Sequence, residues 1–197
     1  MSVIAIINLK GGVGKTMTAM ALASAAVRTG HEAMVWDCDP QASASLWSDL
    51  AAEGGEDLGF EVGSANLSTV RKLSARPGVQ IVDCPPNGNV VDEAMRAADL
   101  VIVPTNASSA DVQKTWDVVD TLEANEKPYR VLLTRVCPNT LAYKGAVSSL
   151  GDGHASRFEA EIPQREGLKN YYGHALSGSL FGYEDVWAEI ESIEGMI

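Results

Sequence analysis

The chain has 197 residues, of which 46% are apolar, and its 26 acidic and 15 basic side chains give it a formal net charge of −11. This length and composition predict a single globular domain over residues 1–197 and exclude a disordered chain. They also exclude a membrane-spanning protein and a disulfide-stabilised module, because no apolar run approaches about 18 residues and the three cysteines are scattered.

The first predicted element is a strand over residues 3–7, which leads through a glycine-rich loop into a helix over residues 16–28. A strand, a glycine loop and a helix in this order are typical of a phosphate-binding loop. The glycines let backbone N–H groups point inward, and the helix N-terminus attracts anions. Lys15 adds a charge for the β- and γ-phosphates, and Thr16 would place a hydroxyl on Mg²⁺. The residues predicted to hold the nucleotide here are Lys10, Gly11, Gly12, Val13, Gly14, Lys15, Thr16 and Met17.

Two further predicted strands deliver carboxylates. The strand over residues 33–37 ends in Asp37, with Asp39 two residues later, and the strand over residues 79–83 ends in Asp83. Acids at the carboxyl ends of strands lie where open α/β sheets bind ligands, and such an Asp reaches the water shell of Mg²⁺ in phosphate-loop ATPases. Ordinary loop acids and a plain strand-ending turn are the alternatives.

The remaining chain continues this alternation of strands and helices. We expect helices over residues 42–52, 66–75, 109–124, 141–150 and 183–196, and strands over residues 60–62, 100–104, 129–134 and 156–162. Apolar runs without polar alternation, separated by helices, predict a three-layer α/β fold, with a mostly parallel twisted sheet and helices on both faces. We assign no chemistry to residues 53–75.

Three motifs in this order resemble those of the ParA/MinD family of ATPases. They are Lys-Gly-Gly-Val-Gly-Lys-Thr at residues 10–16, Asp-Cys-Asp-Pro-Gln at residues 37–41 and Asp-Cys-Pro-Pro at residues 83–86. The first resembles that family's deviant Walker A loop, although Met17 stands where a second Thr is common. The resemblance implies a P-loop NTPase fold. It also implies an ATPase closest to small ParA-type partition proteins without an N-terminal DNA-reading domain.

The resemblance implies roles for individual residues. Lys10 would reach across a homodimer to the partner's nucleotide, while Lys15 holds the phosphates of its own. Asp39 would position the attacking water. Arg135 and Pro163 would lie at the base of ATP, with a bare turn as the alternative for Pro163. The residues that would support Mg²⁺, directly or through its water shell, are Thr16, Asp37, Asp39 and Asp83.

The expected activity is Mg²⁺-dependent ATP hydrolysis that is slow until a ParB-like DNA-binding adaptor stimulates it. The family resemblance implies that ATP closes a homodimer, which then binds DNA non-specifically and drives plasmid or chromosome partition. Residues 127–175 carry seven basic and four acidic side chains, so a local patch can bind DNA although the total charge is acidic. Solvated surface charges are the alternative. The residues expected to contact DNA are Lys144, Arg165 and Lys169.

Two other functions are alternatives to partition. A cargo-positioning or scaffold ATPase would space protein complexes on the nucleoid, and no residue here separates it from a partition ATPase. A metabolic phosphate-loop enzyme such as dethiobiotin synthetase is disfavoured, because its family's loop lacks a residue like Lys10. The last predicted helix carries no Lys or Arg, so we expect no membrane recruitment and a cytoplasmic, nucleoid-associated protein.

Overall fold

A computed structural model describes residues 2–193 of the chain. Its centre is a six-stranded sheet in which every pair of neighbouring strands is parallel, in the order β3-β2-β4-β1-β5-β6. The strands are β1 (Ser2–Ile6), β2 (Ala33–Asp37), β3 (Glu61–Ser64), β4 (Val79–Asp83), β5 (Leu100–Thr105) and β6 (Tyr129–Leu133). This sheet confirms the predicted fold class.

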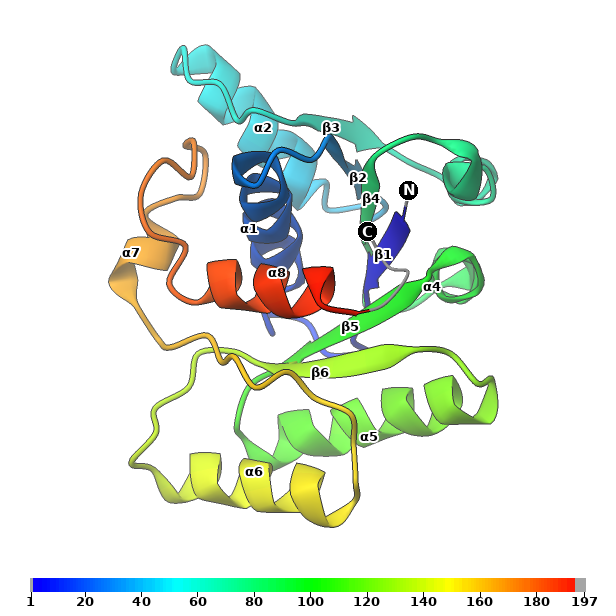
Figure 1. The fold of residues 1–197 in the computed structure, drawn as a ribbon, viewed down its shortest axis with the longest axis vertical. Coiled ribbons are helices and arrows are strands. Elements are labelled where there is room, and N and C mark those ends of the chain that lie inside the picture. The colour runs from blue at the N-terminus through cyan, green and yellow to red at the C-terminus, as the bar shows by residue number, and fades with distance from the viewer. Residues whose placement is uncertain (1, 194–197) are drawn as a thin grey trace.

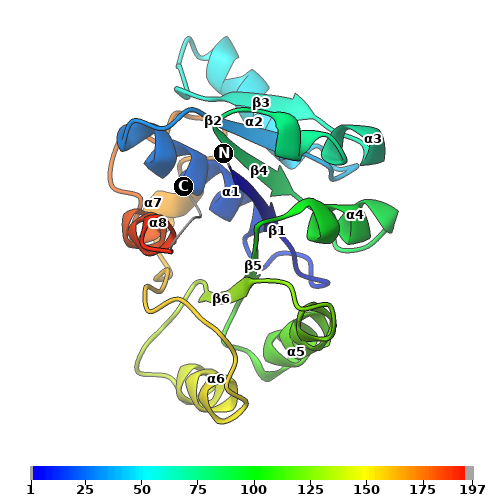
Figure 2. The ribbon, with the colours of Figure 1, turned by 45° about the vertical axis from the view of Figure 1, so that its right-hand side comes forward.

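Helices cover both faces of the sheet (Figures 1 and 2). Trp47 and Trp187 belong to the core on the face covered by α1, α2 and α8, while Val91 and Val119 belong to the core on the face covered by α3 to α6. The helices are α1 (Lys15–Arg28), α2 (Ser43–Glu53), α3 (Leu67–Val70), α4 (Asn89–Ala97), α5 (Ser109–Ala124), α6 (Leu141–Asp152), α7 (Glu166–Lys169) and α8 (Tyr183–Glu191), with a 3-10 turn η1 (Leu73–Ala75).

Burial on both faces explains the unbroken apolar runs of the strands. Successive residues of a strand point to opposite faces, so Ile4 and Ile6 enter the core under α1 while Val3 and Ala5 enter the core under α4 and α5. All five residues of β1 and of β4 are buried. Because the strands are parallel, their carboxyl ends lie along one rim of the sheet, where the pairing of β2 with β4 places Asp37 opposite Asp83.

Residues 156–162 do not form the predicted strand. Only isolated bridges join Arg157 to Val131 and Pro163 to Val136. Between them, the backbone N–H groups of Glu159 and Ala160 donate to the carboxylate of Glu189 on α8, at 3.1 and 2.7 Å, instead of extending the ladder. A long-range side-chain contact thus interrupts the pairing.

Helix boundaries bring three further corrections. The last helix ends at Glu191 and not at residue 196, and residues 194–197 lie outside the described part of the chain. The predicted helix over residues 66–75 is divided into α3 and η1. Helices α4 and α7 were not predicted at all. Over the described residues, the structure contains no helix whose length and hydropathy would let it span a membrane.

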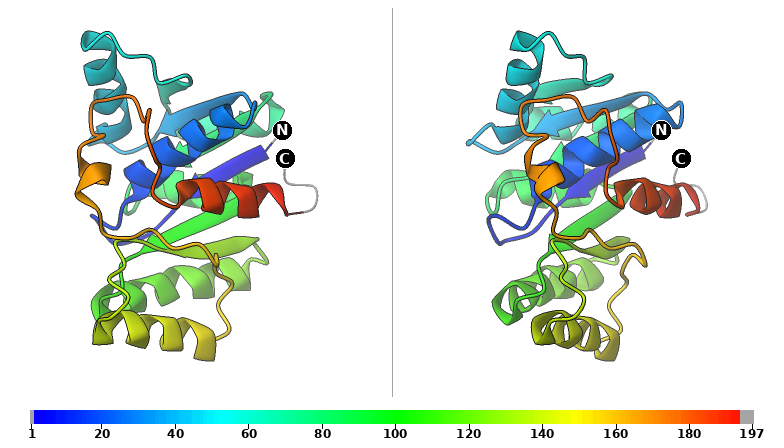
Figure 3. Two further views of the ribbon diagram at one scale, coloured as in Figure 1. Left: turned by 60° about the vertical axis from the view of Figure 1, so that its left-hand side comes forward. Right: turned by 90° about the vertical axis from the view of Figure 1, so that its left-hand side faces the viewer.

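The connection from α6 to α8 brings distant residues together. It carries α7 and runs past α1 as far as α2 (Figure 3). There the Trp47 Nε1 on α2 donates to the backbone oxygen of His174 at 2.8 Å. This connection consequently forms one wall beside the rim of the sheet.

Candidate functional site

The glycine loop between β1 and α1 takes a conformation that its sequence makes possible. Gly12 and Gly14 have φ values of 80° and 95°, a region that side chains disfavour. Asn8 holds the loop entrance, since its Oδ1 accepts from the Lys10 N–H at 2.9 Å. The Thr134 hydroxyl donates to the Val13 carbonyl oxygen at 2.9 Å. The N-terminus of α1 has no side-chain cap, which leaves its first N–H groups available to an anion.

Lys15 lies at the start of α1 and is 8% exposed. Its Nζ donates to the Lys10 carbonyl oxygen at 3.3 Å. Burial lowers the pKa of the Lys15 ammonium, while Asp83 and Asp39 partly oppose this shift by stabilising the charge. A phosphate would add the anionic partner that a buried ammonium requires.

Asp83 is 1% exposed and accepts a hydrogen bond on Oδ2 from the Thr16 hydroxyl at 2.6 Å. The pKa of Asp83 is raised to about 7, chiefly by burial and also by Asp37 and Asp39, while the Thr16 hydrogen bond and Lys15 oppose the rise. Its Oδ1 has no hydrogen-bond partner among residues 2–193. A buried carboxylate with a free oxygen beside a Thr hydroxyl suits the water shell of Mg²⁺.

Asp37 and Asp39 play different structural parts. Asp37 is buried, and its Oδ2 accepts from the Ser45 N–H and hydroxyl at 2.8 and 2.9 Å, so it anchors the start of α2. Its Oδ1 accepts from the Asp39 N–H at 3.1 Å. The Asp39 side chain lies on the cavity wall, where it accepts from the Gln41 N–H at 2.9 Å. Within the described chain, no three His, Cys, Asp or Glu side chains form a metal-binding group.

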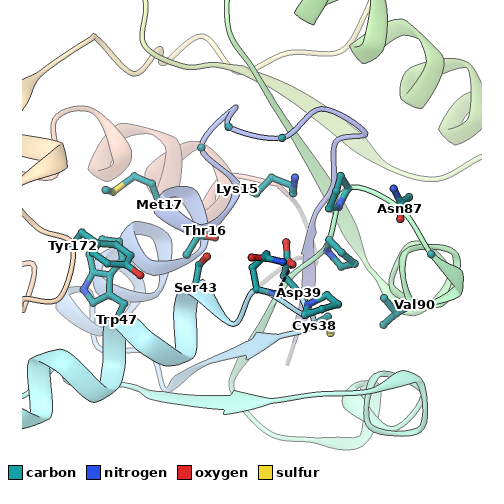
Figure 4. A pocket seen from close by; sticks show the side chains of 18 of the residues that line it. Lys15, Thr16, Met17, Cys38, Asp39, Ser43, Trp47, Asn87, Val90 and Tyr172 are labelled. Carbon is teal, nitrogen blue, oxygen red and sulfur yellow. Dashed lines mark hydrogen bonds between the residues drawn. The ribbon is translucent and has the colours of Figure 1, made fainter.

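Lys15, Thr16 and Asp39 line a cavity of about 800 Å³ (Figure 4). Lys15, Thr16 and Asp39 lie in the middle of the view, while Trp47 and Tyr172 lie side by side at one end. Gly11, Gly12, Gly14 and Met17 line the cavity from the loop side. Val13 is fully buried, and Asp37 and Asp83 lie behind the wall.

A second cavity of about 540 Å³ adjoins the first. Arg135, which has a φ of 51°, lines both cavities, and Pro163 lines the second. Arg135 follows the end of β6 and Pro163 lies in the connection after α6, and the bridge between Val136 and Pro163 holds these two segments together. The predicted base-binding residues are therefore brought together beside the loop, although their contact with a base stays a prediction.

The predicted DNA-contacting residues fall on two elements. Arg165 precedes α7 and Lys169 is its last residue; both are exposed and line the second cavity. The Lys169 Nζ forms an ion pair with the Glu166 carboxylate at 2.8 Å. Lys144 is exposed on α6. Lys10 is exposed at the loop entrance and is absent from the cavity lining.

Sequence reasoning missed two aromatic residues of the site. Trp47 lies in the predicted helix over residues 42–52 without a motif that marks a binding residue, and Tyr172 follows α7 without one. Both line the first cavity, with ring centroids 5.4 Å apart. No local sequence pattern predicts the contact between Trp47 and Tyr172, because this contact depends on how the connection from α6 to α8 folds back onto α2.

Known proteins resemble this chain in sequence and in structure. The family model described as the CobQ/CobB/MinD/ParA nucleotide binding domain matches residues 4–176. Maintenance of carboxysome distribution protein A of Gloeobacter kilaueensis is 36% identical over 143 residues, which are 71% of this chain and 65% of that protein. Protein ParA of Rhizobium radiobacter is 27% identical over 177 residues, which are 84% of this chain and 79% of that protein.

A solved structure shares the fold. The septum site-determining protein MinD of Pyrococcus horikoshii OT3, complexed with Mg-ADP, aligns with a TM-score of 0.74 at 20% sequence identity, over 98% of this chain and 97% of that chain. The present chain spans less than two thirds of the length of the Gloeobacter relative.

Proposed function

The chain belongs to the CobQ/CobB/MinD/ParA nucleotide-binding family of P-loop ATPases, and we propose that it is a ParA-type ATP hydrolase that acts in DNA partition. The three sequence motifs predicted this family. In the proposed cycle, two chains close over two ATP·Mg²⁺, a partner protein stimulates slow hydrolysis, and the dimer binds DNA only in the ATP state.

The observation that carries the proposal is the meeting of Lys15, Thr16 and Asp39 on one cavity, with Asp83 behind them. Lys15 and the N–H groups of the loop bind and orient the phosphates. The Asp39 carboxylate orients the attacking water and accepts its proton. Thr16 and Asp83 would hold Mg²⁺, which neutralises phosphate charge when bound. The Mg-ADP complex of the Pyrococcus relative supports this ligand.

The exposure of Lys10 supports its proposed role in a dimer. Its backbone oxygen accepts from Lys15, whereas its side chain belongs to the exposed surface at the loop entrance. From there it is available to a second copy of the chain and to the nucleotide bound by that copy. Lys10 would then contribute charge stabilisation during hydrolysis in the dimer.

The test compares Lys15→Ala with Lys10→Ala as its matched control. Lys15→Ala should abolish ATP binding, because it removes the buried charge at the phosphates. Lys10→Ala should keep ATP binding and lose ATP-dependent dimerisation and hydrolysis. Isothermal titration, sedimentation and phosphate release measure the three properties. Equal loss of ATP affinity in both variants would refute the deviant-loop assignment.

A role in partition requires DNA binding, which local rather than total charge would provide. The Rhizobium relative carries the ParA name, and Arg165 and Lys169 lie beside the nucleotide cavities, so nucleotide can influence their positions. We expect weak binding to mixed-sequence duplex that requires ATP and weakens steeply with salt. Filter binding with ATP, ADP and no nucleotide tests this. Retention that does not depend on ATP would contradict the mechanism.

The second candidate function is positioning of a protein cargo on the nucleoid. The identity of 36% to a protein named for carboxysome distribution favours it. Both candidates need the same ATPase cycle and differ in the adaptor that stimulates it. A ParB-like adaptor that binds DNA should stimulate hydrolysis if the cargo is DNA, whereas an adaptor that binds a protein complex should do so if the cargo is protein. Purification of the stimulating adaptor decides between them.

A further inference from the structure

Four residues line both cavities and form the passage between them: Gly14, Met17, Arg135 and Tyr172. A nucleotide whose phosphates lie on the glycine loop must pass these residues to place its base in the second cavity. Gly14 offers no side chain, and Met17 offers a flexible thioether. Arg135 and Tyr172 are the two that present a flat surface to a base.

Tyr172 is held in place from one side. Its ring lies against Trp47, with the two planes inclined at 58°, and Trp47 is itself 1% exposed. Tyr172 remains 44% exposed. In Figure 4 the two rings lie side by side near Met17. One part of the Tyr172 ring is therefore covered by protein, and the rest is free to contact a ligand.

The backbone that carries Tyr172 is clamped to α2 and to the loop after it. Glu56 accepts hydrogen bonds from His174 Nδ1 at 2.8 Å and from the Ala175 N–H at 2.6 Å. Gly173 has a φ of 82°, and a Cβ there would lie 3.1 Å from the Cβ of Leu50. These contacts hold the backbone next to Tyr172 in place before any ligand arrives.

We propose that Tyr172 stacks on the base of the bound nucleotide and is a specificity-determining residue of this site. This inference rests on the proposed function. Stacking on the aromatic ring would stabilise a bound base of any kind, and a purine most, because a purine has the larger π-surface.

The test compares ATP with a ligand that has phosphates but no base. Isothermal titration in Mg²⁺ measures ATP, CTP and tripolyphosphate with the wild type and with Tyr172→Ala, Tyr172→Phe and the surface control Asn170→Ala. Tyr172→Ala should bind ATP about tenfold more weakly and lose part of the preference for ATP over CTP. It should bind tripolyphosphate as the wild type does. Tyr172→Phe and Asn170→Ala should match the wild type for all three ligands.

Each contrary result has a separate meaning. If Tyr172→Ala binds ATP as the wild type does, Tyr172 does not contact the base, while the proposed nucleotide site stands. If it loses tripolyphosphate and ATP equally, Tyr172 supports the fold of the site and not the base, and the inference is overturned. If the wild type binds neither ATP nor tripolyphosphate, the proposed function and this inference fall together.

Discussion

Asp83→Asn should change how the stability of the protein depends on pH. Asp83 is 1% exposed, one of its oxygens has no hydrogen-bond partner among residues 2–193, and burial raises its pKa from 3.8 to about 7. In the unfolded chain the same carboxyl ionises near its ordinary value. Between these two values the folded protein holds a proton that the unfolded chain has lost, so the free energy of unfolding must fall as pH rises.

The size of the effect follows from the shift. A rise from 3.8 to about 7 spans roughly three pKa units, and each unit corresponds to about 1.4 kcal/mol, so the loss amounts to about 4 kcal/mol across the window. Above about pH 7 both states are ionised, and this contribution no longer changes. An Asn at this position does not titrate and can still accept the Thr16 hydrogen bond.

Urea unfolding of the wild type and of Asp83→Asn, without nucleotide or Mg²⁺, measures the effect between about pH 4 and pH 8. The difference between the two unfolding free energies should move in favour of the variant by up to about 4 kcal/mol as pH rises. A pH-independent cost of the amide does not affect how this difference changes with pH, and titrating groups that do not interact with Asp83 cancel. Parallel pH profiles would refute the assignment of a buried, charge-destabilised carboxylate at Asp83.

Three further predictions test separate parts of the site. Asp39→Ala should still bind ATP·Mg²⁺ but turn over at least about 100-fold more slowly and accumulate as a dimer, as phosphate release and sedimentation would show; a monomer with wild-type turnover would contradict the role of Asp39. Thr134→Val should lower the free energy of urea unfolding by about 1–3 kcal/mol, because it leaves the buried Val13 oxygen without its donor; an unchanged unfolding free energy would mean that this hydrogen bond does not stabilise the loop. Replacing Lys144, Arg165 and Lys169 together by Ala should reduce the salt dependence of ATP-dependent DNA binding, whereas the control Lys114→Ala on α5 should not. Identical salt slopes for the two variants would exclude these three residues as the DNA-binding patch.

The parts of the site that sequence alone predicts are those carried by contiguous runs. The glycine loop and the aspartates that end β2 and β4 depend on a strand and on the few residues after it, so local pattern is enough. Helix α4 was missed although its local signal is present, since Val91 and Ala94 are buried at helical spacing and Val90 and Met95 pack against the same core. The failed strand over residues 156–162 depends on Glu189, far along the chain.

The buried charges at the rim of the sheet give the site a common logic. Burial shifts the pKa of Lys15 downward and that of Asp83 upward, so each group is pushed toward its neutral form. The two do not resolve this by pairing, since Asp83 is bonded to Thr16 and the Lys15 Nζ to the oxygen of Lys10. A phosphate next to Lys15 and a cation next to Asp83 would stabilise both charged forms at once. Without a ligand, the buried charged forms of Lys15 and Asp83 destabilise the fold. A nucleotide with its metal would stabilise both charges, so the relief of this destabilisation contributes to the binding energy.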